Sequence, residues 1–279
     1  MKKIILSIVF FAAVIQQSNA TQWMTSFEDA KKLSIATNKL IVIDFWATWC
    51  KPCIEMESNT WNQPEIQELL NGFVPLKIDI DVFRKVSNKY SANRIPYVLI
   101  VDANGEVIYN ETGYKDKNQM LKVLKKYAIN TSALQSDYAS FNKEPNAEAA
   151  MSIAEKYYDT SIYVNDDVEN DYMNLASNYL RMVKKLSTKK EYKEKYEQKA
   201  DLLDDAYRLL LRGKNEKVLE VLKDKFKESE IASENKGLFD FMHFVAYKKL
   251  EDNENAKLWY DKLKTDKNYK FYLLKSRKI

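Results

Sequence analysis

Two cysteines, Cys50 and Cys53, constrain this chain more than any other feature, and they are the only cysteines among its 279 residues. They follow a near-continuous apolar run at 40–46 and a short polar loop. Such a run is typical of a central strand that is covered on both faces. A strand, a short turn and two thiols at the start of a helix form the layout of a dithiol/disulfide redox site.

Two other uses of a cysteine pair explain the sequence less well. A structural disulfide across so short a loop would remove little entropy from the unfolded chain and would stabilise the fold weakly. A zinc site needs about four ligands, and besides the two thiols the chain offers only His243, which is remote in sequence. We therefore interpret the pair as redox-active. We expect no metal and no cofactor beyond the Cys50–Cys53 pair itself.

The amino terminus has the pattern of a signal peptide. Two lysines follow Met1, residues 4–15 are apolar, and residues 18–20 place small side chains where a signal peptidase reads them. About 12 apolar residues are too few to span a bilayer, which needs about 20, although a retained membrane anchor is the alternative. We expect cleavage after Ala20 and an exported protein, periplasmic if the cell is bacterial.

Composition limits the class of protein. Hydrophobic residues make up 46% of the chain and aromatic residues 13%, which is ample for packed cores, and 5 Gly and 5 Pro argue against a disordered chain. The net charge of +4 is spread over 44 basic and 40 acidic residues. This near-balance gives no reason to expect nucleic acid or an anionic membrane as partner.

The first half of the chain has the pattern of an α/β domain. Strands are predicted at 40–46, 73–80, 97–101 and 106–110, and helices at 27–37, 50–61, 62–70, 82–90 and 116–127. Ser26 and Asn62 are expected to cap two of these helices. Early strands joined by helices should run parallel, and the strands joined by the Asn104-Gly105 turn should run antiparallel. We predict a mixed four-stranded sheet flanked by helices.

The chain resembles the thioredoxin superfamily over roughly residues 22–129. The resemblance is carried by residues 44–53 (DFWATWCKPC), by Ile95-Pro96 and by Gly113. The stretch 53–66 (CIEMESNTWNQPEI) is similar to the carboxy-terminal thioredoxin-like domain of DsbD-type thiol:disulfide interchange proteins and their soluble relatives. The chain lacks the proline that kinks the active-site helix of cytosolic thioredoxins, and Ser58 or a neighbour stands there instead.

The two cysteines are expected to have different roles. At a helix N-terminus, Cys50 faces unpaired N–H groups and the positive end of the helix dipole, which favour the thiolate. Lys51 adds positive charge, and Pro52 suits a first helical turn because it has no N–H to satisfy there. We assign Cys50 as nucleophile. Cys53 lies a turn deeper, where burial should raise its pKa, and we assign it as the resolving thiol.

Other residues are expected to support the thiols. Asp44 lies in an apolar strand, so its pKa should be raised and it could accept a proton near neutrality. The resemblance implies that it serves Cys53, usually through a water; the alternative is an Asp that caps local backbone. The resemblance also implies a cis bond at Ile95-Pro96, with the Ile95 backbone free to pair with an extended substrate. The alternative there is a trans proline that starts a strand.

The surroundings of the thiols receive simpler interpretations. Trp49 is expected to offer an apolar contact surface beside the sulfurs, and Trp46 to pack in the interior. Glu55 and Glu57, which follow on the helix, are interpreted as a solvated face. The predicted substrate-binding residues are therefore Trp49, Lys51, Pro52, Ile95 and Pro96.

The predicted reaction is thiol–disulfide exchange with a disulfide-containing client protein. The Lys-Pro pair between the cysteines lacks the histidine of strongly oxidising sites, which favours a reductase over an oxidase. An exported reductase needs an electron donor, and we expect a membrane thiol protein. Two alternatives remain open: a helical adaptor or chaperone-like protein whose thioredoxin-like part docks partners, and a disulfide isomerase if the protein is dimeric.

The second half of the chain is predicted to be all α-helical. Helices are expected at 147–159, 168–186, 191–211, 216–226, 236–251 and 256–265. The predicted division is a signal peptide at 1–20, a thioredoxin-like domain at 21–129, a linker at 130–146 and a helical domain at 147–279. A weak repeat with an offset of 40 residues, in which Ala206-Tyr207 recurs as Ala246-Tyr247, resembles tetratricopeptide-type hairpins. His243 is interpreted as a packed histidine, and the helical domain as a possible surface for a homodimer.

Overall fold

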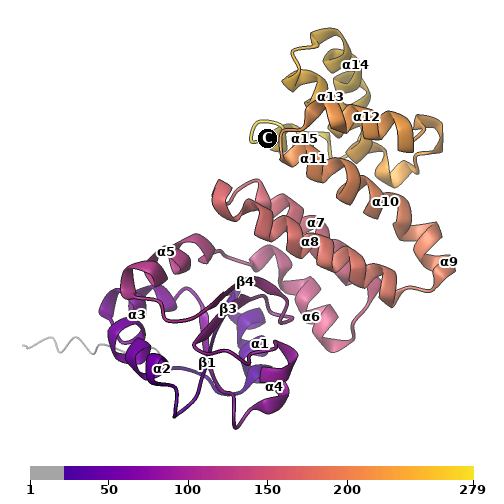
Figure 1. The fold of residues 1–279 in the computed structure, drawn as a ribbon. Helices are drawn as coiled ribbons and strands as arrows, with labels where there is room; N and C mark the ends of the chain where they lie inside the picture. The colour runs from indigo at the N-terminus through magenta and orange to yellow at the C-terminus, as the bar shows by residue number, and fades with distance from the viewer. Residues whose placement is uncertain (1–21) are drawn as a thin grey trace, which may run out of the picture.

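The computed structural model describes residues 22–279 (Figure 1), so the expected signal peptide lies outside the described residues. A four-stranded sheet with the order β2-β1-β3-β4 forms the first half. Its strands are β1 (Ile41–Trp46), β2 (Val74–Asp79), β3 (Tyr97–Val101) and β4 (Val107–Thr112). β1 runs parallel to β2, whereas β3 is antiparallel to both β1 and β4. The predicted mixed four-stranded sheet is confirmed.

The direction of β3 differs from our expectation that strands joined by helices run parallel. The connection from β2 to β3 contains only one short helix, α4 (Arg84–Lys89). A parallel return requires a crossover of a dozen or more residues, usually a helix that runs back along the face of the sheet. α4 is too short for that, so β3 starts at the end of the sheet where β2 stops.

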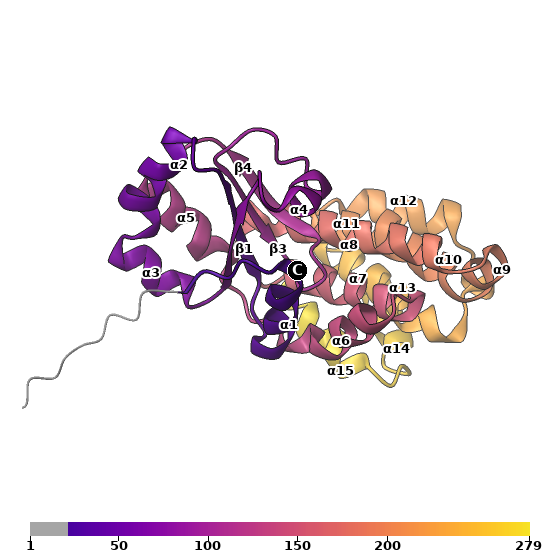
Figure 2. The same cartoon turned by 90° about the horizontal axis from the view of Figure 1, so that it is seen from below.

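Helices cover both faces of the sheet (Figure 2). They are α1 (Phe27–Thr37), α2 (Lys51–Met56), the π-helical turn η1 (Glu57–Trp61), α3 (Pro64–Leu70), α4 and α5 (Lys117–Tyr127). Alternate residues of β1 pack in opposite directions: Val42 joins the core under α2, α3 and α5, whereas Ile41 and Ile43 join the core under α1. β1 is thus buried on both faces, as its continuous apolar run predicts.

Capping agrees with the sequence at one of the two predicted positions. The Ser26 side chain accepts a hydrogen bond from the Asp29 N–H at the start of α1. Asn62 does not cap α3, because its own N–H still bonds the Glu57 carbonyl and closes the π-helical turn. The residue that precedes α3 is Gln63, which has an extended backbone and makes no side-chain cap.

The chain from residue 128 to 279 contains helices and no strand. Its α-helices are α6 (Gln135–Lys143), α7 (Ala147–Ser161), α8 (Asp166–Leu186), α9 (Lys189–Glu191), α10 (Glu197–Asp201), α11 (Arg208–Leu211), α12 (Asn215–Lys225), α13 (Lys236–Lys249), α14 (Asn253–Leu263) and α15 (Tyr269–Lys275). The long helix expected at 191–211 is a series of short α-helical and π-helical segments. No helix within residues 22–279 has both the length and the apolarity needed to cross a membrane.

The segment 130–146, which we expected to be a linker, contains packed structure. It holds the 3-10 turn η2 (Ser132–Leu134) and α6, and the side chains of Leu134 and Tyr138 are buried. α6 contacts α1 and α7. The Tyr138 hydroxyl also pairs with the Tyr157 hydroxyl of α7. This segment therefore packs against both halves of the chain.

Two helical hairpins, α11–α12 and α13–α14, share the same turn geometry, but the offset between them is not the predicted one. The Lys214 N–H bonds the Leu209 carbonyl in one turn, and the Asp252 N–H bonds the Tyr247 carbonyl in the other. These equivalent turns lie 38 residues apart, not 40. The Ala-Tyr pairs that suggested the repeat are therefore out of step with it by two residues.

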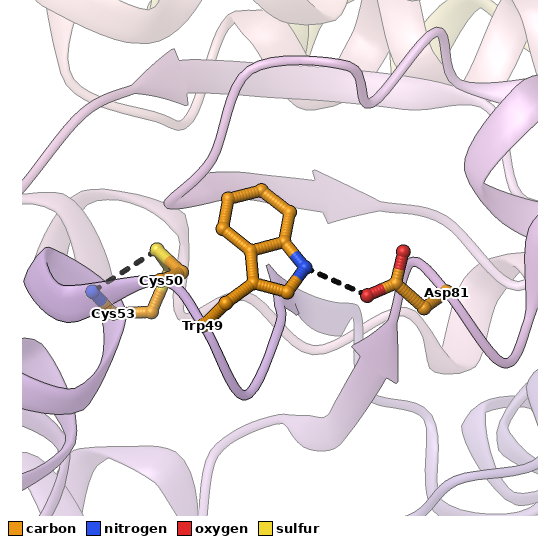
Figure 3. Close-up of a disulfide and its surroundings, with 4 residues drawn as sticks. All are labelled: Trp49, Cys50, Cys53 and Asp81. Atoms are coloured by element: carbon orange, nitrogen blue, oxygen red, sulfur yellow. Dashed lines mark hydrogen bonds between the residues drawn. A yellow bond between two sulfur atoms is a disulfide. The ribbon is translucent and has the colours of Figure 1, made fainter.

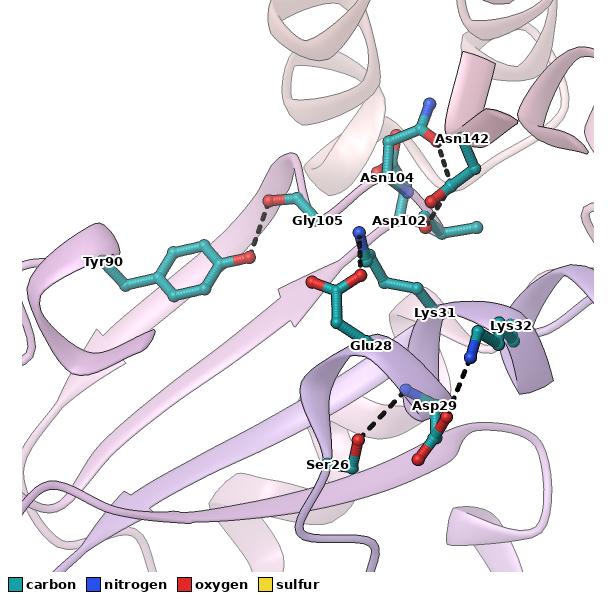
Figure 4. A network of polar contacts seen from close by, with 11 residues as sticks. Ser26, Glu28, Asp29, Lys31, Lys32, Tyr90, Asp102, Asn104, Gly105 and Asn142 are labelled. Atoms are coloured by element: carbon teal, nitrogen blue, oxygen red, sulfur yellow. Dashed lines mark hydrogen bonds and ion pairs between the residues drawn. The ribbon is translucent and has the colours of Figure 1, made fainter. Parts of the chain in front are cut away.

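The helical half docks on the turn between β3 and β4. Asp102 in this turn is fully buried and accepts hydrogen bonds from the hydroxyls of Tyr179 at 2.5 Å and Tyr157 at 3.3 Å. Asn142 of α6 donates to the Asn104 side chain at 2.7 Å (Figure 4). α2 lies on the far side of the sheet from the helical half in both ribbon views. The docked helices thus leave the start of α2 uncovered.

Candidate active site

The two cysteines form a disulfide at the start of α2. Cys50 is the residue that precedes the helix, and its Sγ lies 3.3 Å from the backbone N–H of Cys53 (Figure 3). Lys51 is exposed, and Pro52 lies in the first turn, as the sequence predicts. In this oxidised state both cysteines are buried, with 3% of Cys50 and 6% of Cys53 exposed. The first turn of the helix therefore directs the Cys53 N–H at the Cys50 sulfur, while the same N–H also bonds the Cys50 carbonyl.

Trp49 lies beside the disulfide and is 66% exposed. Its indole Nε1–H donates to the carboxylate of Asp81 at 2.8 Å (Figure 3). Our sequence reasoning missed Asp81. A signal was present, because β1 and β2 are parallel and acidic residues at the end of β2 must lie near the loop that follows β1. Asp81 holds a large apolar surface in place next to the sulfurs.

The Ile95–Pro96 peptide bond is cis, as the resemblance implied. The Ile95 side chain packs against a small apolar cluster that consists of Ala47, Cys50 and Cys53. The carbonyl of Pro96 accepts a hydrogen bond from the Gly113 N–H at 2.7 Å. Two segments that are distant in sequence, the cis-proline loop and the cysteine turn, are therefore in contact.

Asp44 is buried in the middle of β1, with 3% of its surface exposed. Burial raises the pKa of Asp44 to about 7, because the carboxylate loses its contact with water; Lys77 acts in the opposite direction, and Glu57 adds to the rise. Lys77 is the register partner of Asp44 on β2. A carboxyl group with this pKa can accept and release a proton near neutral pH, as we predicted.

Glu57, which we interpreted as part of a solvated face, is only partly exposed. Glu57 forms an ion pair with Lys77, whose ammonium also lies 5.4 Å from the ring centroid of Trp23 and 5.5 Å from that of Trp46. Glu57 is the first residue of the π-helical turn η1, where the helix leaves regular α geometry. The lysine inside the apolar strand 73–80 was the available signal for this cluster. Glu55 is exposed, as expected.

No group of three or more histidine, cysteine or acidic side chains suited to a metal is found in the part of the chain that the structure describes. His243 is buried in α13 against Phe239 and Trp259, which agrees with its interpretation as a packed residue.

Comparison with known proteins gives the family. A family model described as a thioredoxin-like domain matches residues 27–128. Thioredoxin-1 of Drosophila melanogaster is 34% identical over 97 residues, which are 34% of this chain and 89% of that protein. The chain belongs to the thioredoxin-like family. Thioredoxin of Chlamydia trachomatis is also 34% identical, over 98 residues that cover 34% of this chain and 87% of the relative.

Solved structures match a similar share of the chain. The oxidised C-terminal domain of DsbD from Neisseria meningitidis is 21% identical, with a TM-score of 0.33 over 38% of this chain and 99% of that domain. A thioredoxin from Thermus thermophilus is 18% identical, with a TM-score of 0.36 over 39% of this chain and 88% of its own. The family membership and the Cys50–Cys53 disulfide together make this chain a thioredoxin-like thiol–disulfide oxidoreductase, and the helical half follows the matched region.

Proposed function

We propose that the chain is an exported reductase of protein disulfides that acts through the Cys50–Cys53 dithiol. The observation that carries the proposal is the position of Cys50 at the N-terminus of α2, ahead of Cys53. The central strand of the same domain contains Asp44, whose pKa burial raises to about 7. A dithiol at a helix start favours a reactive thiolate, and a buried carboxyl group near neutrality can take up a proton.

The reaction transfers two electrons to the client. The Cys50 thiolate attacks one sulfur of a client disulfide, forms a mixed disulfide and releases the other client sulfur as a thiolate. Asp44 accepts the proton of Cys53, and the Cys53 thiolate attacks the Cys50 sulfur. The mixed disulfide then breaks, the second client thiolate leaves, and the Cys50–Cys53 disulfide found in the structure is formed.

Client binding in this proposal uses the surface around Cys50. The exposed Trp49 supplies an apolar face that Asp81 holds in place. Ile95 packs against the sulfurs, and its backbone can pair with an extended client segment. Lys51 and Pro52 complete the surface from the first turn of α2.

Three further parts of the proposal concern the setting of the reaction. Export follows from the signal-peptide pattern of the first 20 residues. Reduction rather than oxidation follows from the Lys51-Pro52 pair, which offers no histidine to stabilise the reduced form. Each turnover leaves the Cys50–Cys53 pair oxidised, so an exported reductase must be reduced again. We propose a membrane thiol protein as the electron donor, and no other cofactor is required.

The test is the reduction of insulin disulfides by the wild-type protein and by two cysteine variants. Cys50→Ser should lose the activity completely, whereas Cys53→Ser should accumulate mixed disulfides on Cys50, because the resolving attack is lost. Glu55→Gln, an exposed change one turn away, is the matched control and should retain full activity. Full biological activity in both cysteine variants would instead support an adaptor.

The direction of the reaction is tested by equilibrium with glutathione. A reductase should have a potential well below that of the strong oxidants, which lies near −120 mV. A value close to −120 mV would overturn the reductase assignment and leave an oxidase. Light scattering on the mature protein addresses the isomerase alternative, which requires a dimer.

A further inference from the structure

The only histidine of the chain lines an aromatic pocket in the helical half. α13 places Phe239, His243 and Tyr247 at intervals of four residues, so the three side chains share one stripe of the helix. Trp259 of α14 stacks on the imidazole, with ring centroids 3.9 Å apart and an interplanar angle of 16°. Together with residues of α12, these side chains line a cavity of about 420 Å³.

The hydrogen bond of the imidazole fixes the position of its proton. Nδ1 of His243 lies 3.0 Å from the carbonyl oxygen of Phe239. A carbonyl oxygen can only accept, so Nδ1 carries the hydrogen and donates it. Burial is the main cause that lowers the pKa of His243 to about 4, so the ring is neutral at neutral pH. Nε2 is then an acceptor with a free lone pair.

This acceptor is open to the cavity. Within residues 22–279, Nε2 of His243 has no hydrogen-bond partner. Part of this atom's surface is accessible to solvent, unlike that of the buried polar atoms that lack a partner. Because His243 lines the cavity, a molecule that enters from the surface can reach this lone pair. The cavity therefore combines aromatic walls with a neutral nitrogen acceptor set between them.

The charges around the cavity balance one another in sign. The Lys262 ammonium lies 3.8 Å from the ring centroid of Trp259 and bonds both carboxylate oxygens of Glu228 at 2.8 Å. Glu220 and Lys223, which are exposed residues of α12, supply one charge of each sign at the rim. The rim therefore has no excess charge of either sign that would select a charged ligand. A neutral aromatic group that carries one donor matches both the walls and the acceptor.

We propose that this cavity binds a tyrosine side chain of a partner polypeptide. The phenol ring packs against the Phe239–His243–Tyr247 stripe, and its hydroxyl donates a hydrogen bond to Nε2 of His243. Tyrosine joins a large apolar ring to a single polar tip, and such residues serve as anchors in protein interfaces. The cavity volume is within the range of natural ligand pockets. This inference does not depend on the proposed reductase activity.

The first test uses two small probes that differ in whether the oxygen on the ring carries a hydrogen or a methyl group. p-Cresol carries a phenolic hydroxyl, whereas 4-methylanisole has the same ring with that hydroxyl methylated. Because the chain has a single histidine, the imidazole NMR signals of the full-length protein report the site without ambiguity. We expect saturable shifts, with p-cresol binding roughly three- to tenfold more tightly, the usual effect of one neutral hydrogen bond. N-acetyltyrosinamide should bind, and N-acetylphenylalaninamide should bind more weakly.

Two variants and a control complete the experiment. His243→Phe keeps an aromatic ring but removes the acceptor, so both probes should bind it equally. Leu219→Trp fills the cavity from α12 while leaving the His243 imidazole in the protein, and it should abolish binding, as followed by the His243 signals. Leu258→Trp, at a position of α14 that is 51% exposed and outside the cavity lining, is the matched control and should bind as the wild type does. Insulin reduction should persist in all three variants.

Several results would overturn the inference. They are the absence of saturable shifts, equal affinities of the two probes for the wild type, and undiminished binding to Leu219→Trp. If His243→Phe does not fold, two comparisons still test the inference. They are the binding of p-cresol to the two tryptophan variants and the affinities of the two probes for the wild type. Binding of p-cresol without N-acetyltyrosinamide would overturn the polypeptide partner and leave a site for a small phenol.

Discussion

At the scale of single residues, two buried carboxyl groups show how environment sets chemistry. Asp44 in β1 lies beside Lys77, whereas Asp102 in the β3–β4 turn accepts four hydrogen bonds and joins the two halves of the chain. Burial raises the pKa of both carboxyl groups. Both belong to the same residue type, and both are almost inaccessible to solvent. The hydrogen bonds that Asp102 accepts offset part of this rise and tie it to its neighbours as a structural anchor, whereas Asp44 faces the charges of Lys77 and Glu57.

Asp44 should make the stability of the fold depend on pH. Its pKa rises from 3.8 in the unfolded chain to about 7 in the folded one, so the folded state binds more protons between these values. Asp44 should therefore contribute a fall in the free energy of unfolding as pH rises from 4 to 7, by about 4 kcal/mol at most for this one group. Asp44→Asn should remove this contribution, whereas the contribution of Glu106, whose pKa burial also raises to about 7, should remain. Urea unfolding across this pH range measures the fall in each protein, and an unchanged pH dependence in the variant would contradict the assignment.

Glu57 should set how strongly Asp44 attracts its proton. Glu57→Gln removes a negative charge near Asp44 and frees Lys77 to interact with it, and both changes lower the pKa of Asp44. The acidic limb of the pH–rate profile for insulin reduction should move to lower pH by about half a unit to one unit. Glu55→Gln is the control, because Glu55 is exposed on the same helix. Equal profiles for the two variants would refute a role for Glu57.

At the scale of elements, the sequence located most helices and strands, because their signals are local. Period-two and continuous apolar runs marked the four strands, and capping residues such as Ser26 marked helix starts. α6 and α15 were not predicted, since neither has a long amphipathic pattern and each is held by packing. The antiparallel direction of β3 was also missed, because strand direction depends on how the connecting chain crosses the sheet.

The β3–β4 turn depends on the glycine at its tip. Gly105 has φ +84°, and a Cβ there would lie 2.7 Å from both the Phe27 ring and the Tyr90 hydroxyl. Gly213 also has positive φ, +66°, but a Cβ there would meet nothing within 4 Å. Gly213→Ala should therefore cost roughly 1 kcal/mol of backbone strain, and Gly105→Ala about 2 kcal/mol or more. Urea unfolding of both variants is the measurement, and equal losses would show that the close contacts at Gly105 carry no cost.

At the scale of the whole molecule, the two halves share one continuous apolar core and one polar junction. The largest apolar cluster extends from Val42 of the sheet to Leu263 of α14. At the junction, Tyr157 and Tyr179 from α7 and α8 donate to Asp102 of the β3–β4 turn. The region that was expected to be a linker contributes Tyr138 to the same network. These contacts indicate that the helical half, which comes after the redox half in the sequence, also stabilises it.

The junction should make the two halves unfold together. Tyr179→Phe removes one of the hydrogen bonds to the buried Asp102 and should lower the free energy of unfolding by about 1–3 kcal/mol. Tyr163→Phe, at a position that is 60% exposed, is the control and should change it little. Both variants should still unfold in a single transition when far-UV circular dichroism and tryptophan fluorescence are compared. Separate transitions, with only the helical signal shifted by Tyr179→Phe, would show that the halves are independent.

The sequence by itself determined the dithiol, its strand–turn–helix setting, the candidate proton acceptor Asp44 and the α/β-then-α order of the chain. These features depend on local spacing, so a linear pattern contains them. The tertiary structure alone decided that Glu57 and Lys77 meet beside Asp44, that Asp81 holds Trp49, and that Asp102 joins the two halves. Strand register and helix docking create these contacts, and both arise from how distant surfaces fit together.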